Sequence, residues 1–198
     1  MIEFINISKS IPYLKIIEYY ERAIEADQKN IEAISIASFN SNKNEVDSRY
    51  VNLKFIDEDN FIFFTNYNSP KSLAFELHDQ ISACLFWSSI NIQIRMKAKI
   101  KKTSKEFNKR YFKERSNDKN ALAISSDQSK IISSYEEVIK KYQNVSDTKN
   151  LSDCPDYWGG YSFKPYEIEF WEGHKSRINK RDFFELNQNR WHHSILEP

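Results

Sequence analysis

Glycine is scarce in this chain: only three of the 198 residues are glycine, and all three lie in the last quarter at Gly159, Gly160 and Gly173. Phosphate-binding loops of the dinucleotide-binding and P-loop kinds need several glycines where a strand turns into a helix. The sequence therefore argues against both kinds of loop. Side chains or ordinary backbone amides must hold any phosphate that the protein binds.

Cysteine is also scarce, and long apolar runs and an excess of one charge are absent. Two cysteines, Cys84 and Cys154, do not make the pattern of a disulfide framework. No apolar run approaches the roughly 20 residues that span a bilayer, and the N-terminus MIEFINISKS lacks the basic-then-apolar pattern of a signal peptide. The net charge of +1 is not the basic excess typical of nucleic-acid binders. We expect a cytoplasmic protein that binds neither a membrane nor nucleic acid.

The composition fits one globular domain. Hydrophobic residues make up 40% of the chain and aromatic residues 15%, which is enough to bury a sizeable core. We expect a single domain over residues 1–198. Within it we expect a helical segment in residues 1–30 and a loop at 144–157, which contains the polar stretch NVSDTKNLSD.

Hydrophobic periodicity and capping signals predict both helices and strands. Ser10 and Pro12 favour a helix over 10–27, and Ser69 followed by Pro70 favours a second helix over 69–79. Further helices are expected at about 104–115, capped by Ser104, and at 128–142. The β-rich runs are 32–40, 48–57, 60–67, 81–89, 91–104, 161–173, 176–186 and 190–196. Neighbouring strand pairs with helices between them predict an antiparallel, barrel-like α+β domain.

One polar triplet stands out near the C-terminus. Arg177, Asn179 and Arg181 recur at every second position of SRINKRDFFEL, so on a strand they would share one face. The two arginines would then lie roughly 13 Å apart, too far to hold one phosphate together. They either serve two anionic groups or are unrelated surface charges, and composition alone favours surface charges.

A second candidate pair lies in the run SRYVNLKFID. Arg49 and Lys54 flank its apolar centre, as cations at strand ends often do. Strict alternation puts them on opposite faces of a strand. A shared ligand would therefore require a β-bulge or a contribution from a second subunit.

Two more clusters lie at helix ends. Thr65, Ser69 and Lys71 come where a strand leads into a helix N-terminus, which suits an anion, although simple capping by Ser69 is compatible with the same pattern. Tyr111 and Arg115 are four residues apart and would share a helix face. The pair Gln128–Ser129 is expected to open the following helix.

Common catalytic sets are not found. The four histidines and two cysteines lack zinc-ligand spacing, and the sequence has no GxSxG nucleophile elbow. We expect no metal centre.

Taken in order, these clusters resemble the pyridoxine/pyridoxamine 5′-phosphate oxidase family. The resemblance covers about residues 32–198, and its most specific part is the EFWxG…R…R ending. It rests on the segments SRYVNLK, FIFFTNYNSPK, ISACLFW, NIQIRMKAKIKK, YFKERS, SSDQS, WGGYSFKPYEIEFWEG and RINKR. It implies an antiparallel split β-barrel with flanking helices, and a homodimer that binds two FMN molecules in clefts between the subunits.

The resemblance also implies a reaction and a set of site residues. Pyridoxamine or pyridoxine 5′-phosphate would be oxidised to pyridoxal 5′-phosphate, the flavin would accept a hydride, and O2 would reoxidise it with release of H2O2. Arg177 and Asn179 would be the catalytic residues. FMN would contact Arg49, Tyr50, Val51, Asn52, Leu53, Lys54, Phe64, Thr65, Lys71, Gln93, Gln128, Ser129, Trp171 and Arg181. The substrate would contact Lys54, Tyr111, Arg115, Lys119, Arg177 and Asn179.

Three positions depart from the family pattern. Pro70 replaces an arginine expected at the FMN phosphate, Lys119 a serine expected at the substrate phosphate, and Asn179 a histidine. Asparagine does not titrate near neutral pH, so any role as a proton carrier is lost at position 179. These changes leave two alternatives open. One is an FMN oxidoreductase that acts on another reductant, such as a dihydrophenazine, and the other is a flavin-binding dimer without catalysis.

Overall fold

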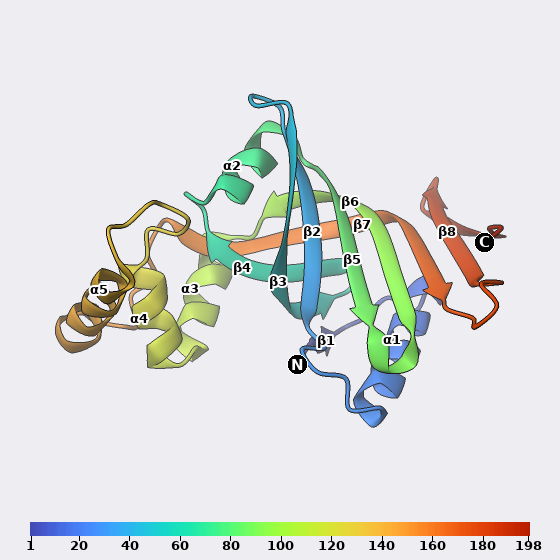
Figure 1. Ribbon diagram of the computed structural model, residues 1–198, viewed down its shortest axis with the longest axis horizontal. Coiled ribbons are helices and arrows are strands. Elements are labelled where there is room, and N and C mark those ends of the chain that lie inside the picture. Colours follow the sequence, from blue (N-terminus) through green and yellow to red (C-terminus); the bar gives the residue numbers. More distant parts are fainter.

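The computed structural model describes all residues from 1 to 198, and its centre is a closed barrel of six antiparallel strands (Figure 1). Around the barrel the pairing runs from β3 through β2, β5, β6, β7 and β4 back to β3. The six strands are β2 (Ala33–Asn40), β3 (Glu45–Asp57), β4 (Asn60–Asn66), β5 (Gln80–Trp87), β6 (Ile92–Lys102) and β7 (Trp158–Glu172). The antiparallel split-barrel fold expected from the sequence is confirmed.

The long strand β7 carries the sheet beyond the barrel. Its first residues pair with β4, whereas its last residues pair with β8 (Lys180–Asn187), and β8 pairs in turn with β9 (Arg190–Ile195). A short strand that the sequence did not predict, β1 (Glu3–Ile5), adds to β3 in parallel. The C-terminal hairpin therefore stands apart from the barrel, on the opposite side from the helical lobe over residues 105–148 (Figure 1).

The helices lie around the barrel ends and on one side. The first, α1 (Ile11–Glu25), adds Tyr13, Ile16 and Tyr19 to the core and covers the end of the barrel away from α2 (Pro70–Leu77; Figure 1). The lobe consists of α3 (Lys105–Glu114), α4 (Asn117–Ser125) and α5 (Tyr135–Thr148), and a single 3₁₀ turn (η1, Ser88–Ile90) joins β5 to β6. None of these helices combines the length and the apolar character needed to span a membrane.

The core follows from alternation along the strands. In β6, Ile92, Ile94, Met96, Ala98 and Ile100 are all buried, as their spacing predicts, and the charged residues between them face outward. Full burial of each aliphatic side chain of this size contributes about 1.5–3 kcal/mol. The packed barrel is therefore a rigid support for the side chains on its outer face and rim.

The predicted helix over 128–142 is wrong at its beginning. Gln128 and Ser129 lie in a turn between α4 and α5, where Ser129 has a φ of 68° and the Lys130 amide donates to the Asp127 carbonyl over 3.0 Å. The helix begins after Ser134, whose hydroxyl accepts from the Glu137 amide. It continues to residue 148, so the first residues of the loop expected at 144–157 are helical, and α4 was not predicted.

The predicted strand over 176–186 is also wrong at its beginning. Residues 173–179 form a compact loop in which the Arg177 amide donates to the His174 carbonyl over 2.9 Å. The Asn179 side-chain oxygen accepts from the His174 amide, also over 2.9 Å. Arg177 has a φ of 62°, in the left-handed region that no strand residue adopts. Strand alternation therefore does not place Arg177, Asn179 and Arg181 on one face.

Candidate active site

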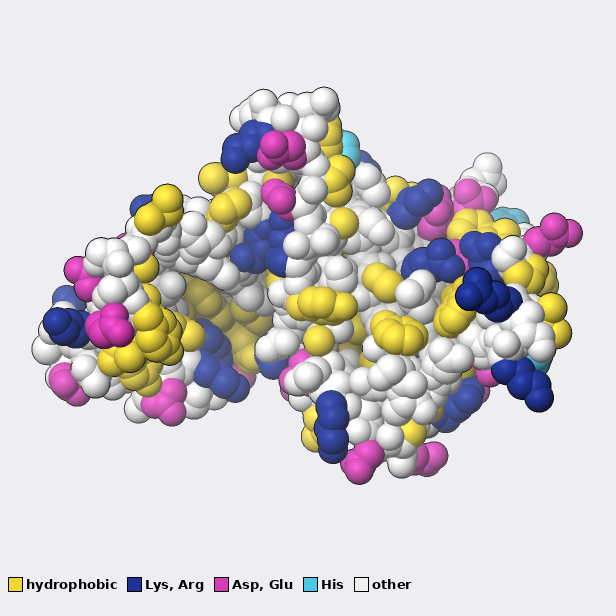
Figure 2. All heavy atoms as spheres, viewed as in Figure 1, with side chains coloured by type: hydrophobic (Ala, Val, Ile, Leu, Met, Phe, Trp, Pro, Cys, Tyr) yellow, Lys and Arg dark blue, Asp and Glu magenta, His cyan; other side chains and the backbone are white.

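A cavity of about 1040 Å³ lies between the helical lobe and the barrel. Figure 2 shows it as a hollow with Lys and Arg side chains on its walls and hydrophobic side chains at its base. Most of the residues expected from the sequence line it: Arg49, Tyr50, Val51, Asn52, Lys54, Phe64, Thr65, Lys71, Tyr111, Arg115, Lys119, Gln128 and Ser129. Three separate parts of the chain, β3–β4, the start of α2 and the lobe, thus converge on one cavity.

Arg49 and Lys71 form the first cationic group of the cavity. Arg49 reaches across from β3 and donates to the Ile36 carbonyl over 3.1 Å and to the Ser38 hydroxyl over 2.8 Å. Lys71, in the first turn of α2, is buried and donates to the Ser69 hydroxyl over 3.1 Å. Burial, followed by the nearby charge of Arg49, lowers the pKa of Lys71 to about 8. No carboxylate pairs with Lys71, so the two cations lie together without a compensating negative charge beside Lys71.

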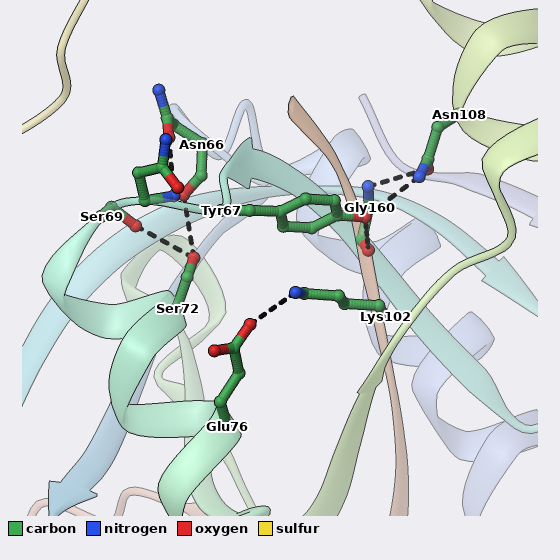
Figure 3. Close-up of polar contacts among 9 residues, drawn as sticks. Asn66, Tyr67, Ser69, Ser72, Glu76, Lys102, Asn108 and Gly160 are labelled. Atoms are coloured by element: carbon green, nitrogen blue, oxygen red, sulfur yellow. Dashed lines mark hydrogen bonds and ion pairs between the residues drawn. The ribbon is translucent and has the colours of Figure 1, made fainter. Parts of the chain in front are cut away.

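Ser69 occupies the N-cap position of α2 but does not cap it in the expected way. Its hydroxyl contacts the Ser72 hydroxyl over 3.0 Å (Figure 3). It also accepts from Lys71, and it binds no backbone amide. Beside it, the Gln128 side-chain oxygen accepts from the Thr65 hydroxyl over 3.1 Å and from the Asn66 amide over 3.3 Å. These bonds fix the turn after α4 to the end of β4.

Lys54, Arg115 and Lys119 form the second cationic group. Burial lowers the pKa of Lys54, and the charges of Lys119 and Arg115 lower it further, against the opposing effect of Glu32. The pairing of β3 with β4 shifts register between Leu53 and Phe55. This register shift at Lys54 is a β-bulge, one of the two ways in which Arg49 and Lys54 were expected to be able to share a ligand, and both residues line the cavity.

Stacked aromatic rings form the base of the cavity. Phe64 stacks on Tyr111 with 4.0 Å between ring centroids, and on Trp158 with 5.1 Å and an interplanar angle of 8°. The guanidinium carbon of Arg115 lies 4.4 Å above the Trp158 ring. Trp158 was not among the predicted site residues. The segment WGG that begins β7 was the only signal for it.

Gln93, Trp171 and Arg181 form a second cluster away from the cavity. They lie in register on β6, β7 and β8, and Arg181 donates to the Glu169 carboxylate over 2.7 Å and to the Glu197 carbonyl over 2.8 Å. The outer face of the barrel separates the cluster from the cavity. The row of paired residues from Tyr50 to Glu169 crosses four strand spacings, roughly 19 Å in all.

The remaining predicted residues also lie outside the cavity. Arg177 and Asn179 belong to the loop before β8, and the Asn179 side-chain oxygen is already bonded to the His174 amide. Leu53 is fully buried in the core. A single copy of the chain therefore brings most of the predicted residues together in the cavity, but not Gln93, Trp171, Arg177, Asn179 and Arg181.

A search of known families and proteins supports a common origin. Residues 158–198 match a family model described as the C-terminal dimerisation region of pyridoxine 5′-phosphate oxidase. A pyridoxine/pyridoxamine 5′-phosphate oxidase of Leptospira interrogans is 32% identical over 193 residues, which are 96% of this chain and 89% of that protein. A protein of the same name from Actinobacillus pleuropneumoniae is 33% identical over 182 residues, or 91% and 86% of the two chains.

Solved structures show the same fold. PhzG from Burkholderia lata, in complex with tetrahydrophenazine-1-carboxylic acid, has a TM-score of 0.89 at 23% identity and covers 96% of this chain and 93% of its own. A pyridoxamine 5′-phosphate oxidase-related, FMN-binding protein from Nostoc punctiforme has a TM-score of 0.79 at 12% identity, with 96% and 99% of the chains covered. With the barrel, the cavity and these relatives together, the chain belongs to the pyridoxine/pyridoxamine 5′-phosphate oxidase family.

Proposed function

We propose that this protein is an FMN-dependent oxidase that converts pyridoxamine or pyridoxine 5′-phosphate to pyridoxal 5′-phosphate, consuming O2 and releasing H2O2. One observation carries the proposal: a single cavity holds two cationic groups, Arg49 with Lys71 and Lys54 with Arg115 and Lys119, beside a base of aromatic rings. Arg49 and Lys54 are separated by roughly 16 Å of strand. Two phosphate-bearing ligands would satisfy both groups at once.

The residues present fit FMN. Arg49 and the buried Lys71 would hold its phosphate without the arginine that Pro70 replaces, and Thr65, Gln128 and backbone near Val51 would contact the rest. Bound FMN supplies the acceptor of the two electrons removed from the substrate, and O2 then takes them as H2O2. Because the cavity holds no glycine-rich loop, charged side chains carry most of the phosphate recognition.

The second cationic group would hold the substrate. Lys54, Arg115 and Lys119 would bind its phosphate, helped by the Tyr111 hydroxyl. Holding the phosphate at one end of the cavity would fix which carbon of the substrate lies against the flavin. Lys119 in place of the usual serine adds a third positive charge, which suits a phosphate dianion.

We infer that the working form is a homodimer with a composite site. Gln93, Trp171 and Arg181 do not line the cavity of their own chain, and four strand spacings along the barrel wall separate Tyr50 from Glu169, the partner of Arg181. A two-fold related copy would bring its own cluster, with Arg177 and Asn179, to the cavity. The match of residues 158–198 to a dimerisation region supports this arrangement.

Asn179 supports a second candidate, an FMN oxidoreductase that acts on another reductant such as a dihydrophenazine. Its side-chain oxygen is occupied by the His174 amide, and it cannot exchange a proton as a histidine would. The fold of PhzG, which was solved with a tetrahydrophenazine acid, is compatible with this alternative.

Anaerobic reduction distinguishes the two candidates. The FMN-loaded protein is mixed without O2 with pyridoxine 5′-phosphate, pyridoxamine 5′-phosphate or a dihydrophenazine carboxylic acid. The visible absorbance of the oxidised flavin is followed, because it is lost when the flavin accepts two electrons. Bleaching by either B6 phosphate, reversed by O2 with formation of H2O2, is the expected result. Bleaching by the dihydrophenazine alone would favour the second candidate. A flavin bleached by dithionite but by no substrate would contradict both.

A further inference from the structure

Two contacts hold the Arg115 guanidinium in the cavity. Its guanidinium carbon lies 4.4 Å above the face of the Trp158 ring. Its Nη2 donates to the Lys119 carbonyl over 3.1 Å. Its Nη1 is buried and has no hydrogen-bond partner. Arg115 as a whole is only half-buried and lines the cavity, so a ligand would meet the remaining, accessible part of the guanidinium.

Trp158 is itself firmly packed. It is 5% exposed, and it lies between the parallel ring of Phe64 and the edge of Phe112, whose centroid is 4.9 Å away at an interplanar angle of 70°. It pairs with Asn66 at the beginning of β7. The ring therefore offers Arg115 a fixed face rather than a mobile one.

Hydrogen bonds around Gly160 fix the helix that carries Arg115 to the strand that carries Trp158. Asn108 of α3 accepts from the Gly160 amide over 2.9 Å and donates to the Tyr67 hydroxyl over 3.0 Å, and that hydroxyl donates to the Gly160 carbonyl over 3.0 Å (Figure 3). Asn108 is buried, and Arg115 follows the last residue of the same helix. These bonds therefore hold α3 against β7 at Gly160, two residues after Trp158.

We propose that Trp158 is a positioning residue: its ring holds the Arg115 guanidinium flat so that the accessible part of that group meets the phosphate of the substrate. This inference rests on the proposed function and deepens it, since it says what orients Arg115. An arginine side chain has several rotatable bonds, and stacking with the Lys119 carbonyl contact removes most of that freedom before the substrate arrives. The favourable face of an indole also offsets part of the loss of water around the charge.

Two variants test the inference, Trp158→Leu and Trp158→Phe. The leucine removes the π face, whereas phenylalanine keeps an aromatic face of smaller size. In the FMN-loaded protein, Trp158→Leu should raise KM for pyridoxamine 5′-phosphate roughly 3- to 30-fold, the range of a partly buried cation–π contact, with a smaller effect on kcat. Trp158→Phe should recover much of the loss, and FMN retention should stay at the wild-type level in both.

A double-mutant cycle separates positioning from general packing. In an Arg115→Ala background, Trp158→Leu should cause no further weakening of pyridoxal 5′-phosphate binding measured by calorimetry. An equal loss with and without Arg115 would overturn the inference, as would a Trp158→Phe variant as weak as Trp158→Leu. If the leucine variant does not fold, the cycle is run with Trp158→Phe alone, where a loss independent of Arg115 has the same meaning.

Calorimetry measures dissociation constants for pyridoxal 5′-phosphate and for inorganic phosphate without any catalytic turnover. The test of Trp158 is therefore independent of whether the proposed reaction takes place. A wild-type protein that binds them but oxidises no B6 phosphate would contradict the proposed function and leave the Trp158 cycle decisive. A wild-type protein that binds neither would overturn the inference itself.

Discussion

Replacing Lys71 with methionine should stabilise the FMN-free protein while weakening its hold on the cofactor. Lys71 is only 7% exposed, and the pKa of its ammonium group is lowered from 10.5 to about 8 because it is buried and lies near Arg49. A shift of that size corresponds to about 3 kcal/mol of unfavourable free energy in the folded state at neutral pH. Loss of the hydrogen bond to Ser69 offsets about 1 kcal/mol of the gain. The net expectation at pH 7 is a stabilisation of about 1–3 kcal/mol.

The stabilisation should depend on pH in one direction. The unfolded chain keeps its proton up to about pH 10.5, whereas the folded chain releases it from about pH 8. Between these values the unfolded state binds more protons, so the stability of the wild type rises with pH relative to the methionine variant. The advantage of Lys71→Met is therefore complete below pH 8 and fades toward pH 10.5.

Urea unfolding of the FMN-free proteins at pH 7 and pH 10, at one protein concentration, measures both effects. Flavin fluorescence titration measures the cofactor, for which Lys71→Met should bind about 10- to 100-fold more weakly after loss of a charged hydrogen bond. Lys140→Met, on the exposed side of α5, is the matched control and should change neither quantity. A variant less stable than the wild type at pH 7, or equally stabilised at pH 7 and pH 10, would refute the reasoning.

Three further changes have definite expected outcomes. Gly159→Ala would place a Cβ 2.2 Å from the Tyr67 hydroxyl and 2.4 Å from the Asn108 amide nitrogen, so thermal unfolding should show a loss of about 1–3 kcal/mol; unchanged stability would mean that these side chains yield freely. Arg181→Ala should lower FMN retention on a desalting column without altering the molecular mass in solution, and full retention would count against its proposed contact with FMN. Asn179→His should raise kcat/KM for pyridoxine 5′-phosphate by restoring a titratable group; an unchanged or lower value would point to another reductant.

Much of the fold could be predicted because the strands alternate clearly. The buried and charged residues of β6 follow a strict period of two, and Pro70 after Ser69 marks the beginning of α2. The strand predicted from Ser176 failed because period-two spacing of polar residues also occurs in turns. The left-handed backbone of Arg177 interrupts the strand, and this conformation could not be predicted because arginine has no preference for it.

The site could be predicted in part. Arg49, Lys71 and Arg115 were predicted because they lie in the segments SRYVNLK, FIFFTNYNSPK and YFKERS, which resemble the motifs of the family, and all three line the cavity. Trp158 was missed because it precedes the strand predicted over 161–173 and carries no charge that would mark it as a ligand-binding residue. Its contact with Arg115 arises from the meeting of α3 and β7 across more than 40 residues of chain, which no local pattern encodes.

The composite site is the central claim, and complementation between two damaged chains tests it most directly. Lys71→Met and Arg181→Ala proteins are mixed, unfolded and refolded together, so that mixed dimers form. If each flavin lies between the Lys71 of one copy and the Arg181 of the other, every mixed dimer regains one undamaged site, and roughly a quarter of all sites bind FMN with wild-type affinity. If one chain supplies both residues to the same flavin, no undamaged site can form. Flavin titration of the mixture that shows only the weakened affinities of the two parents would contradict the account.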